Sequence, residues 1–185
     1  MDRLKGIPPN MDARQQALHD TIANGPRGRV AGPLALWLNS PDLAERAQAL
    51  GEHLRFNNVF PKHLSEMVIL MVAAHHRCEF EWFVHAPIAA REGLAPQIID
   101  ALRQGRPPED LQGPAAILHD TVRGLLDKNR LSDAQYTDFM SEFGAKALVE
   151  LTALIGYYQI GAHLLNAVEH ETTDGSTVFD RNALT

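Results

Sequence analysis

The chain has 185 residues, of which 45% are hydrophobic and 22% charged, and its net charge at pH 7 is −6. This length and composition suit one globular domain over residues 1–185, with enough chain to bury a core. The negative charge argues against nucleic acid, which selects basic surfaces. The sequence has no run of eighteen apolar residues, no apolar signal segment and only one cysteine. It therefore predicts a cytoplasmic protein with no membrane span and no intrachain disulfide.

Helical periodicity dominates the sequence, and no segment alternates in the way that strands do. Ser40 before Pro41 is a predicted N-cap, and Ser132 with Gln135 is a predicted capping box. Gly93 is the residue expected just after a helix end. The expected helices cover residues 11–24, 41–56, 61–74, 78–92, 96–104, 114–128, 132–144 and 145–170.

These segments predict an all-α fold of about seven or eight helices. The stretch from Leu64 to Ala74 is almost continuously apolar, which is typical of a buried helix. Residues 27–33 are rich in glycine and arginine, and we interpret them as a flexible basic loop. The polar tail at 172–185 is expected to be loosely ordered.

One predicted helix carries the most informative residues. Cys78, Glu81 and His85 are three and four residues apart, so the helical period places them on one face, pointing into one small space. Glu81 could hold the imidazole of His85 in one tautomer, forming an acid–base pair. A structural helix pair is the plain alternative, but the apolar neighbours, including Trp82, would make a buried charged pair costly without a purpose.

Two more residues could join this pair. Glu66 lies in the apolar stretch, where a carboxylate is either a structural partner or a site residue with a raised pKa. Cys78 is either a nucleophile with a lowered pKa or an inert, buried small side chain. Disulfide exchange needs a second thiol, which this chain lacks.

Several residues could bind a substrate. Arg27 and Arg29 in the basic loop could hold a carboxylate, although arginines in loops are more often solvated. Trp82, Tyr157 and His163 could line the same pocket, with helix packing as the alternative for the last two.

A metal site is not expected. His75, His76, Glu81 and His85 are potential ligands, but they do not form a His-Glu-x-x-His motif. Adjacent histidines on a helix project about 100° apart, so they rarely bind one ion together.

The run from Ser65 through Cys78-Glu79-Phe80-Glu81-Trp82 to Gly93 resembles the carboxymuconolactone decarboxylase family, which includes the alkylhydroperoxidase AhpD-like proteins. The similarity centres on residues 40–105, and residues 151–166 look like the longer members of the family. The resemblance implies an AhpD-like all-α fold, a site carried by a helical hairpin, and subunits that associate as homo-trimers or hexamers.

The two branches of the family imply different chemistry. In the peroxidase branch an upstream Glu precedes Cys-x-x-Cys and a His, and here Glu66, Cys78 and His85 match, while Glu81 replaces the second cysteine. In the decarboxylase branch a Glu lies four residues before a His and a Gly eight residues after it. Glu81, His85 and Gly93 fit that second pattern.

The leading hypothesis is therefore a cofactor-independent, decarboxylase-like enzyme that acts on a small carboxylated or lactone substrate. His85, oriented by Glu81, would move a proton, and Arg27 or Arg29 would hold a carboxylate. A single-cysteine thiol peroxidase acting on a hydroperoxide is the alternative, and a non-catalytic oligomeric binding protein is a third interpretation.

Overall fold

The computed structural model describes residues 3–4 and 6–179, and all regular elements in this part of the chain are α-helices. The predicted all-α fold is confirmed. The helices are α1 (Ala13–Asn24), α2 (Pro33–Trp37), α3 (Pro41–Phe56), α4 (Lys62–His75), α5 (Glu79–Arg91), α6 (Pro96–Arg103), α7 (Gly113–Lys128), α8 (Asp133–Glu142) and α9 (Gly144–Ala167).

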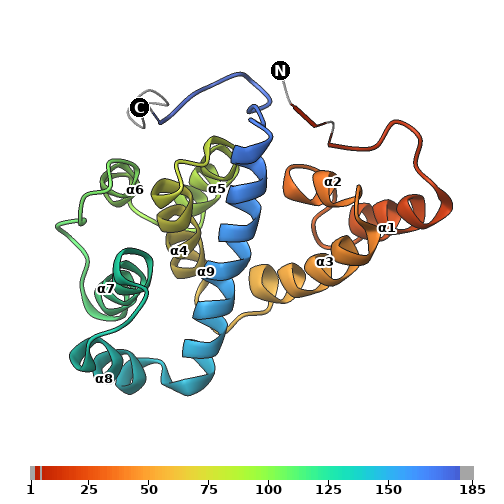
Figure 1. The fold of residues 1–185 in the computed structure, drawn as a ribbon. Helices are drawn as coiled ribbons and strands as arrows, with labels where there is room; N and C mark the ends of the chain where they lie inside the picture. Colours follow the sequence, from red (N-terminus) through yellow and green to blue (C-terminus); the bar gives the residue numbers. More distant parts are fainter. Residues whose placement is uncertain (1–2, 5, 180–185) are drawn as a thin grey trace.

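Helix α4 is the centre of the core. Every residue from Leu64 to Ala73 is buried, because the apolar side chains surround the whole helix and need neighbours on all sides. Helix α4 packs against α5, α6, α7 and α9. Figure 1 shows α9 crossing the molecule between the α1–α3 group and the α6–α8 group. No helix in the described residues is long and apolar enough to cross a membrane.

The sequence missed one helix. The predicted basic loop ends in Gly32 and Pro33, but the chain turns directly into α2 there. Gly32 has a φ of +56°, and a Cβ at this position would lie 2.2 Å from the ring of Phe80. Five residues are too few to show a helical period, so only packing against other helices reveals α2.

The predicted caps all lie at helix ends. Ser132 accepts a hydrogen bond from the Gln135 backbone, and the Gln135 side chain accepts one from the Ser132 backbone, which confirms the capping box. Ser40 is the N-cap of α3 and Pro41 begins the helix, as predicted, although the Ser40 side chain makes no capping hydrogen bond. Gly93 follows the end of α5 with a φ of +97°, as a C-terminal glycine should.

The first part of the predicted C-terminal tail is fixed to the core. The buried carboxylate of Glu79 accepts hydrogen bonds from the backbone N–H groups of Val178 (2.6 Å) and Phe179 (2.9 Å). The Phe179 ring packs edge-on against Trp82 at 5.5 Å. The expectation of a loose tail was therefore wrong up to Phe179, and its remainder, 180–185, lies outside the described residues.

Candidate active site

The hairpin of α4 and α5 brings two distant residues together. The hydrogen bonds that hold the turn between the helices include one from the Cys78 backbone to the Ala73 carbonyl (2.8 Å) and one from the Asn166 side chain to the His76 carbonyl (2.7 Å). With the turn fixed, the buried face of α5 lies against α4. His85 consequently meets Glu66, which is nineteen positions earlier in the chain.

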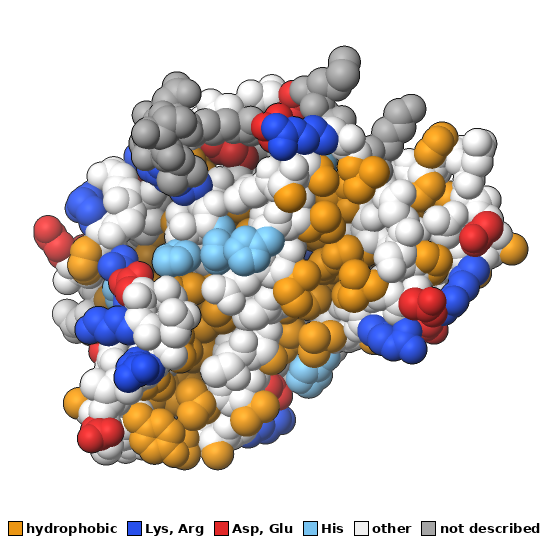
Figure 2. All heavy atoms as spheres, viewed as in Figure 1, with side chains coloured by type: hydrophobic (Ala, Val, Ile, Leu, Met, Phe, Trp, Pro, Cys, Tyr) orange, Lys and Arg blue, Asp and Glu red, His pale blue; other side chains and the backbone are white. Residues whose placement is uncertain are grey.

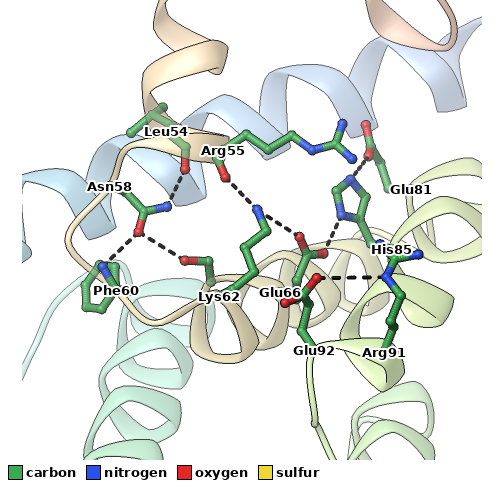
Figure 3. Close-up of polar contacts among 11 residues, drawn as sticks. Leu54, Arg55, Asn58, Phe60, Lys62, Glu66, Glu81, His85, Arg91 and Glu92 are labelled. Carbon is green, nitrogen blue, oxygen red and sulfur yellow. Dashed lines mark hydrogen bonds and ion pairs between the residues drawn. The ribbon is translucent and has the colours of Figure 1, made fainter. Parts of the chain in front are cut away.

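The imidazole of His85 is bracketed by two carboxyl groups. Its Nδ1 lies 2.7 Å from Oε2 of Glu66, and its Nε2 lies 3.5 Å from Oε2 of Glu81. All three side chains are almost completely buried. Figure 3 shows the ring lying between the two carboxyl groups, with Arg55 reaching toward Glu81. The Tyr158 ring packs nearly perpendicular to the imidazole, with the two ring centroids 5.2 Å apart.

The environment of Glu66 favours its ionised form. Burial alone would raise its pKa, but the hydrogen bond with His85 and the positive charges of His85, Lys62 and Arg55 outweigh it, so the pKa is lowered. The Lys62 ammonium lies 3.5 Å from Oε1 of Glu66, an ion-pair distance, while that oxygen accepts no hydrogen bond. An ionised Glu66 favours a proton on Nδ1 of His85, which leaves Nε2 to exchange a proton on the opposite side.

The pKa of Glu81 shifts in the opposite direction from that of Glu66. Burial raises its pKa, the charge of Glu66 adds to that effect, and the charges of His85, Arg55 and Arg27 only partly oppose it. Two carboxyl groups whose environments push their pKa values apart are suited to acceptor and donor roles in proton transfer. The site therefore holds an ionised carboxylate on one side of the imidazole and a more readily protonated carboxyl group on the other.

A cavity of about 290 Å³ opens beside Glu81 and His85. Arg27, Arg29 and Arg55 line it, and within the described residues none of the three forms an ion pair. The Nε atoms of Arg27 and Arg55 are buried and have no hydrogen-bond partner. The remaining lining residues are Ala31, Pro33, Leu34, Phe80, Val84, Tyr157 and Tyr158. A small cavity with unpaired guanidinium groups and an acid–base array suits an anionic organic molecule.

Residues 41–116 match the sequence model of the Carboxymuconolactone decarboxylase family. This part of the chain is therefore similar to that family, as the resemblance in the sequence implied. The matched segment begins one residue after the start of the predicted region, 40–105, and ends about ten residues after its end. A comparison with curated proteins gave no match.

Solved structures of AhpD-like proteins share the fold. An uncharacterized peroxidase-related protein from Silicibacter sp. TM1040 has a TM-score of 0.73 at 13% identity, covering 96% of each chain. A peroxidase-related protein from Ralstonia eutropha JMP134, described as an alkylhydroperoxidase AhpD core, has a TM-score of 0.70 at 14% identity, covering 94% of this chain and 93% of that one. A protein of unknown function from Agrobacterium tumefaciens, described as a candidate antioxidant defence protein AhpD, has a TM-score of 0.64 at 15% identity, covering 74% and 94%.

Cys78 does not line the cavity beside Glu81 and His85. It is the N-cap of α5, with extended dihedral angles, so the helical period that joins Glu81 to His85 does not include it. Its thiol lies in an apolar cluster with Leu36 and Leu165, and burial raises its pKa to about 12. It lines a second cavity of about 240 Å³, which does not include His85. The expectation that Cys78 shares one space with His85 was wrong.

The predicted substrate-binding residues divide into two groups. Arg27, Arg29 and Tyr157 line the arginine cavity, and Nη2 of Arg27 lies 3.5 Å from the Tyr157 hydroxyl. Trp82 is instead part of the main hydrophobic core. His163 is exposed on α9, with its ring 4.6 Å from that of His76, away from the cavity lining. The placement of Trp82 and His163 in the pocket was therefore wrong.

The four potential metal ligands do not converge. Figure 2 shows histidine side chains grouped on one face of the molecule. The rings of His75 and His76 are 5.0 Å apart, whereas His85 is buried between Glu66 and Glu81. Among the residues the structure describes, no group of three or more His, Cys, Asp or Glu side chains is arranged to hold a metal ion.

Sequence reasoning missed three residues of the site. Arg55 and Tyr158 line the cavity, and Lys62 reaches Glu66. Lys62 lies four residues before Glu66 in the same helix, a spacing typical of ion pairs, so it could have been recognised. Arg55 and Tyr158 come from α3 and α9, and no local pattern relates them to α5.

Proposed function

We propose that this protein is a cofactor-independent enzyme that performs acid–base chemistry on a small carboxylated or lactone substrate, with decarboxylation as its reaction type. The observation that carries this proposal is the position of His85, between an ionised Glu66 and a protonatable Glu81, at the wall of an arginine-lined cavity.

The proposed decarboxylation needs a proton donor for the product carbon and groups that stabilise the negative charge that develops as CO2 leaves. When the carbon–carboxylate bond breaks, CO2 leaves and its electron pair stays on the carbon, delocalised into the adjacent carbonyl. His85, with Glu81 beside its Nε2, would then donate a proton to that carbon. Glu66 would keep Nδ1 in place, and the arginines would bind a retained carboxylate and stabilise the developing oxyanion.

Replacement of His85 tests the proposal. With carboxymuconolactone as substrate, H85Q should lose at least about a hundredfold in CO2 release, the usual range for a general acid or base. H19Q is the matched control, because His19 lies on α1 and pairs with Asp20 outside the cavity. Undiminished turnover by folded H85Q would contradict the assigned role, and no turnover by the unmodified protein would contradict this substrate.

A single-cysteine peroxidase is the second candidate, favoured by the peroxidase-related descriptions of the structural neighbours. The Cys78 sulfur would take the terminal oxygen of a hydroperoxide, releasing an alcohol and leaving a sulfenic acid that an external thiol reduces. A buried thiol with a pKa of about 12 is a poor nucleophile at neutral pH. Intact mass after mild peroxide treatment tests this candidate. A prompt gain of one oxygen atom that the C78S variant does not show supports a peroxidase, and no gain refutes it.

The other expectations become part of the same proposal. A homo-trimer or hexamer is expected, and sedimentation velocity of the full chain measures it. A non-catalytic binding protein on this fold would bind carboxylates in the arginine cavity without turnover, so binding and turnover should be measured on the same preparation.

A further inference from the structure

Phe56, the last residue of α3, is surrounded by three cationic side chains. The guanidinium carbon of Arg55 lies 5.4 Å from the centre of the ring, and that of Arg27 lies 5.9 Å away. The Lys62 ammonium lies 5.3 Å from the same centre. The ring is exposed and is not part of the cavity lining. All three distances are within the range in which a cation is attracted to an aromatic ring.

These three cations serve the two ends of the candidate site. Arg27 and Arg55 line the cavity, and their Nε atoms are buried without a hydrogen-bond partner. Lys62 donates a hydrogen bond to the Arg55 carbonyl (2.6 Å) and pairs with Glu66. One aromatic ring therefore contacts the side chains that supply positive charge to both the cavity and the acid–base array.

Few specific contacts hold the two guanidinium groups, although the charge of Glu81 attracts both. Neither forms an ion pair with a described residue, and the hydrogen bond found for Arg27 is a long one, 3.5 Å to the Tyr157 hydroxyl. Three like charges in one region repel one another, and long side chains lose considerable rotamer freedom when they are fixed. The negative face of the Phe56 ring opposes both effects, because it attracts each cation toward the same place.

We propose that Phe56 is a positioning residue for three cations. It holds Arg27 and Arg55 toward the cavity and Lys62 toward Glu66, and so sets the affinity of the cavity for anionic ligands. This inference rests on the proposed function, because it takes the natural ligand to be a small organic anion. Phe56 itself contacts no ligand. Its removal should weaken ligand binding, and so raise KM, more than it lowers kcat.

Succinate, an unreactive dicarboxylate, is the probe for the first test. Isothermal titration of the full-length protein should show that F56L weakens succinate binding about three- to tenfold, as expected for losing weak attractions to two arginines. F56Y should bind within about twofold of the unmodified protein, because it keeps the aromatic face. Y136L is the matched control: Tyr136 is an exposed aromatic residue on α8, outside the cavity.

The outcomes separate this inference from the proposed function. If the unmodified protein binds succinate, R55M loses binding and F56L binds normally, Phe56 has no positioning role, although the anion cavity stands. If the unmodified protein does not bind succinate, the anion cavity itself is refuted, and the inference with it. Equal losses in F56L and F56Y would also overturn the inference, because they would indicate a packing effect rather than an aromatic one.

The Lys62 side of the proposal has its own readout. Carbon NMR of the Glu66 carboxyl group, in protein labelled at glutamate, follows its titration directly. F56L should raise the pKa of Glu66, because a released Lys62 no longer favours the carboxylate. F56Y and Y136L should leave the Glu66 titration unchanged. A Glu66 titration in F56L identical to that of the unmodified protein, in a sample with unchanged thermal stability, would refute the link from Phe56 through Lys62.

Discussion

Replacing Glu66 by glutamine tests whether the negative charge of this carboxylate holds the buried imidazole. Glu66 Oε2 lies 2.7 Å from His85 Nδ1, and the Glu66 side chain is fully buried. Hydrogen bonds with a charged partner contribute about 1.5–3 kcal/mol, and breaking a buried ion pair costs about 3–5 kcal/mol. Because the amide oxygen of glutamine can still accept from Nδ1, we expect E66Q to lose about 1.5–3 kcal/mol of unfolding free energy at pH 7.

This loss should depend on pH. The pKa of Glu66 is lowered in the folded protein, because the hydrogen bond and the nearby positive charges outweigh burial, which alone would raise it. The ionised group therefore stabilises the fold above its unfolded pKa, and this contribution disappears as the pH falls through the folded pKa. The unfolding free energies of E66Q and the unmodified protein should converge on acidification.

Glu81 provides a matched comparison in the same array. Burial raises the pKa of Glu81, so its ionisation destabilises the folded state as the pH rises above the unfolded pKa. Glutamine imitates the neutral form, and E81Q should be as stable as the unmodified protein at pH 7, or more stable. The two variants make the same chemical change on either side of one imidazole, but only E66Q should lower the free energy of unfolding at pH 7.

Urea unfolding, followed by tryptophan fluorescence at pH 7 and at successively lower pH, measures both variants. Equal losses for E66Q and E81Q at pH 7 would refute the opposite pKa shifts of the two carboxyl groups. So would a loss for E66Q that stays constant as the pH falls, because it would come from packing and not from charge.

Two further predictions concern the cavity and the cysteine. A Cβ on Gly51 would lie 2.0 Å from the Tyr157 hydroxyl, so G51A should destabilise the protein by about 1–3 kcal/mol through overpacking and should weaken succinate binding. G156A is the control, because a Cβ on Gly156 has open space around it and should change neither property. Thermal unfolding and succinate titration measure both variants, and a G51A variant that behaves like G156A would contradict the packing described. Cys78 should resist alkylation by iodoacetamide at pH 8 in the folded protein and react readily in urea, as measured by intact mass. Rapid labelling of the folded protein would show that its thiol is neither buried nor protonated.

Local sequence signals predicted most helices, but not which of their residues meet in the folded protein. The Ser132 capping box, the proline at the start of α3 and the glycine after α5 all marked real boundaries. The same local logic failed at Cys78, which lies at the N-cap and not in the helix, so the period of α5 does not apply to it. It failed again at α2, which is buried against other helices and too short to carry a pattern of its own.

The sequence by itself determined the all-α fold and the pair of Glu81 and His85, because helix caps and an i,i+4 spacing act within one element. The tertiary structure alone decided that Glu66 reaches the other side of His85, that Arg55 lines the cavity, and that Cys78 lies in a separate apolar cluster. These relations depend on the packing of α3, α5 and α9 around the buried α4. A repeat of 3.6 residues fixes the face that a helix buries, but not the residues that meet it there.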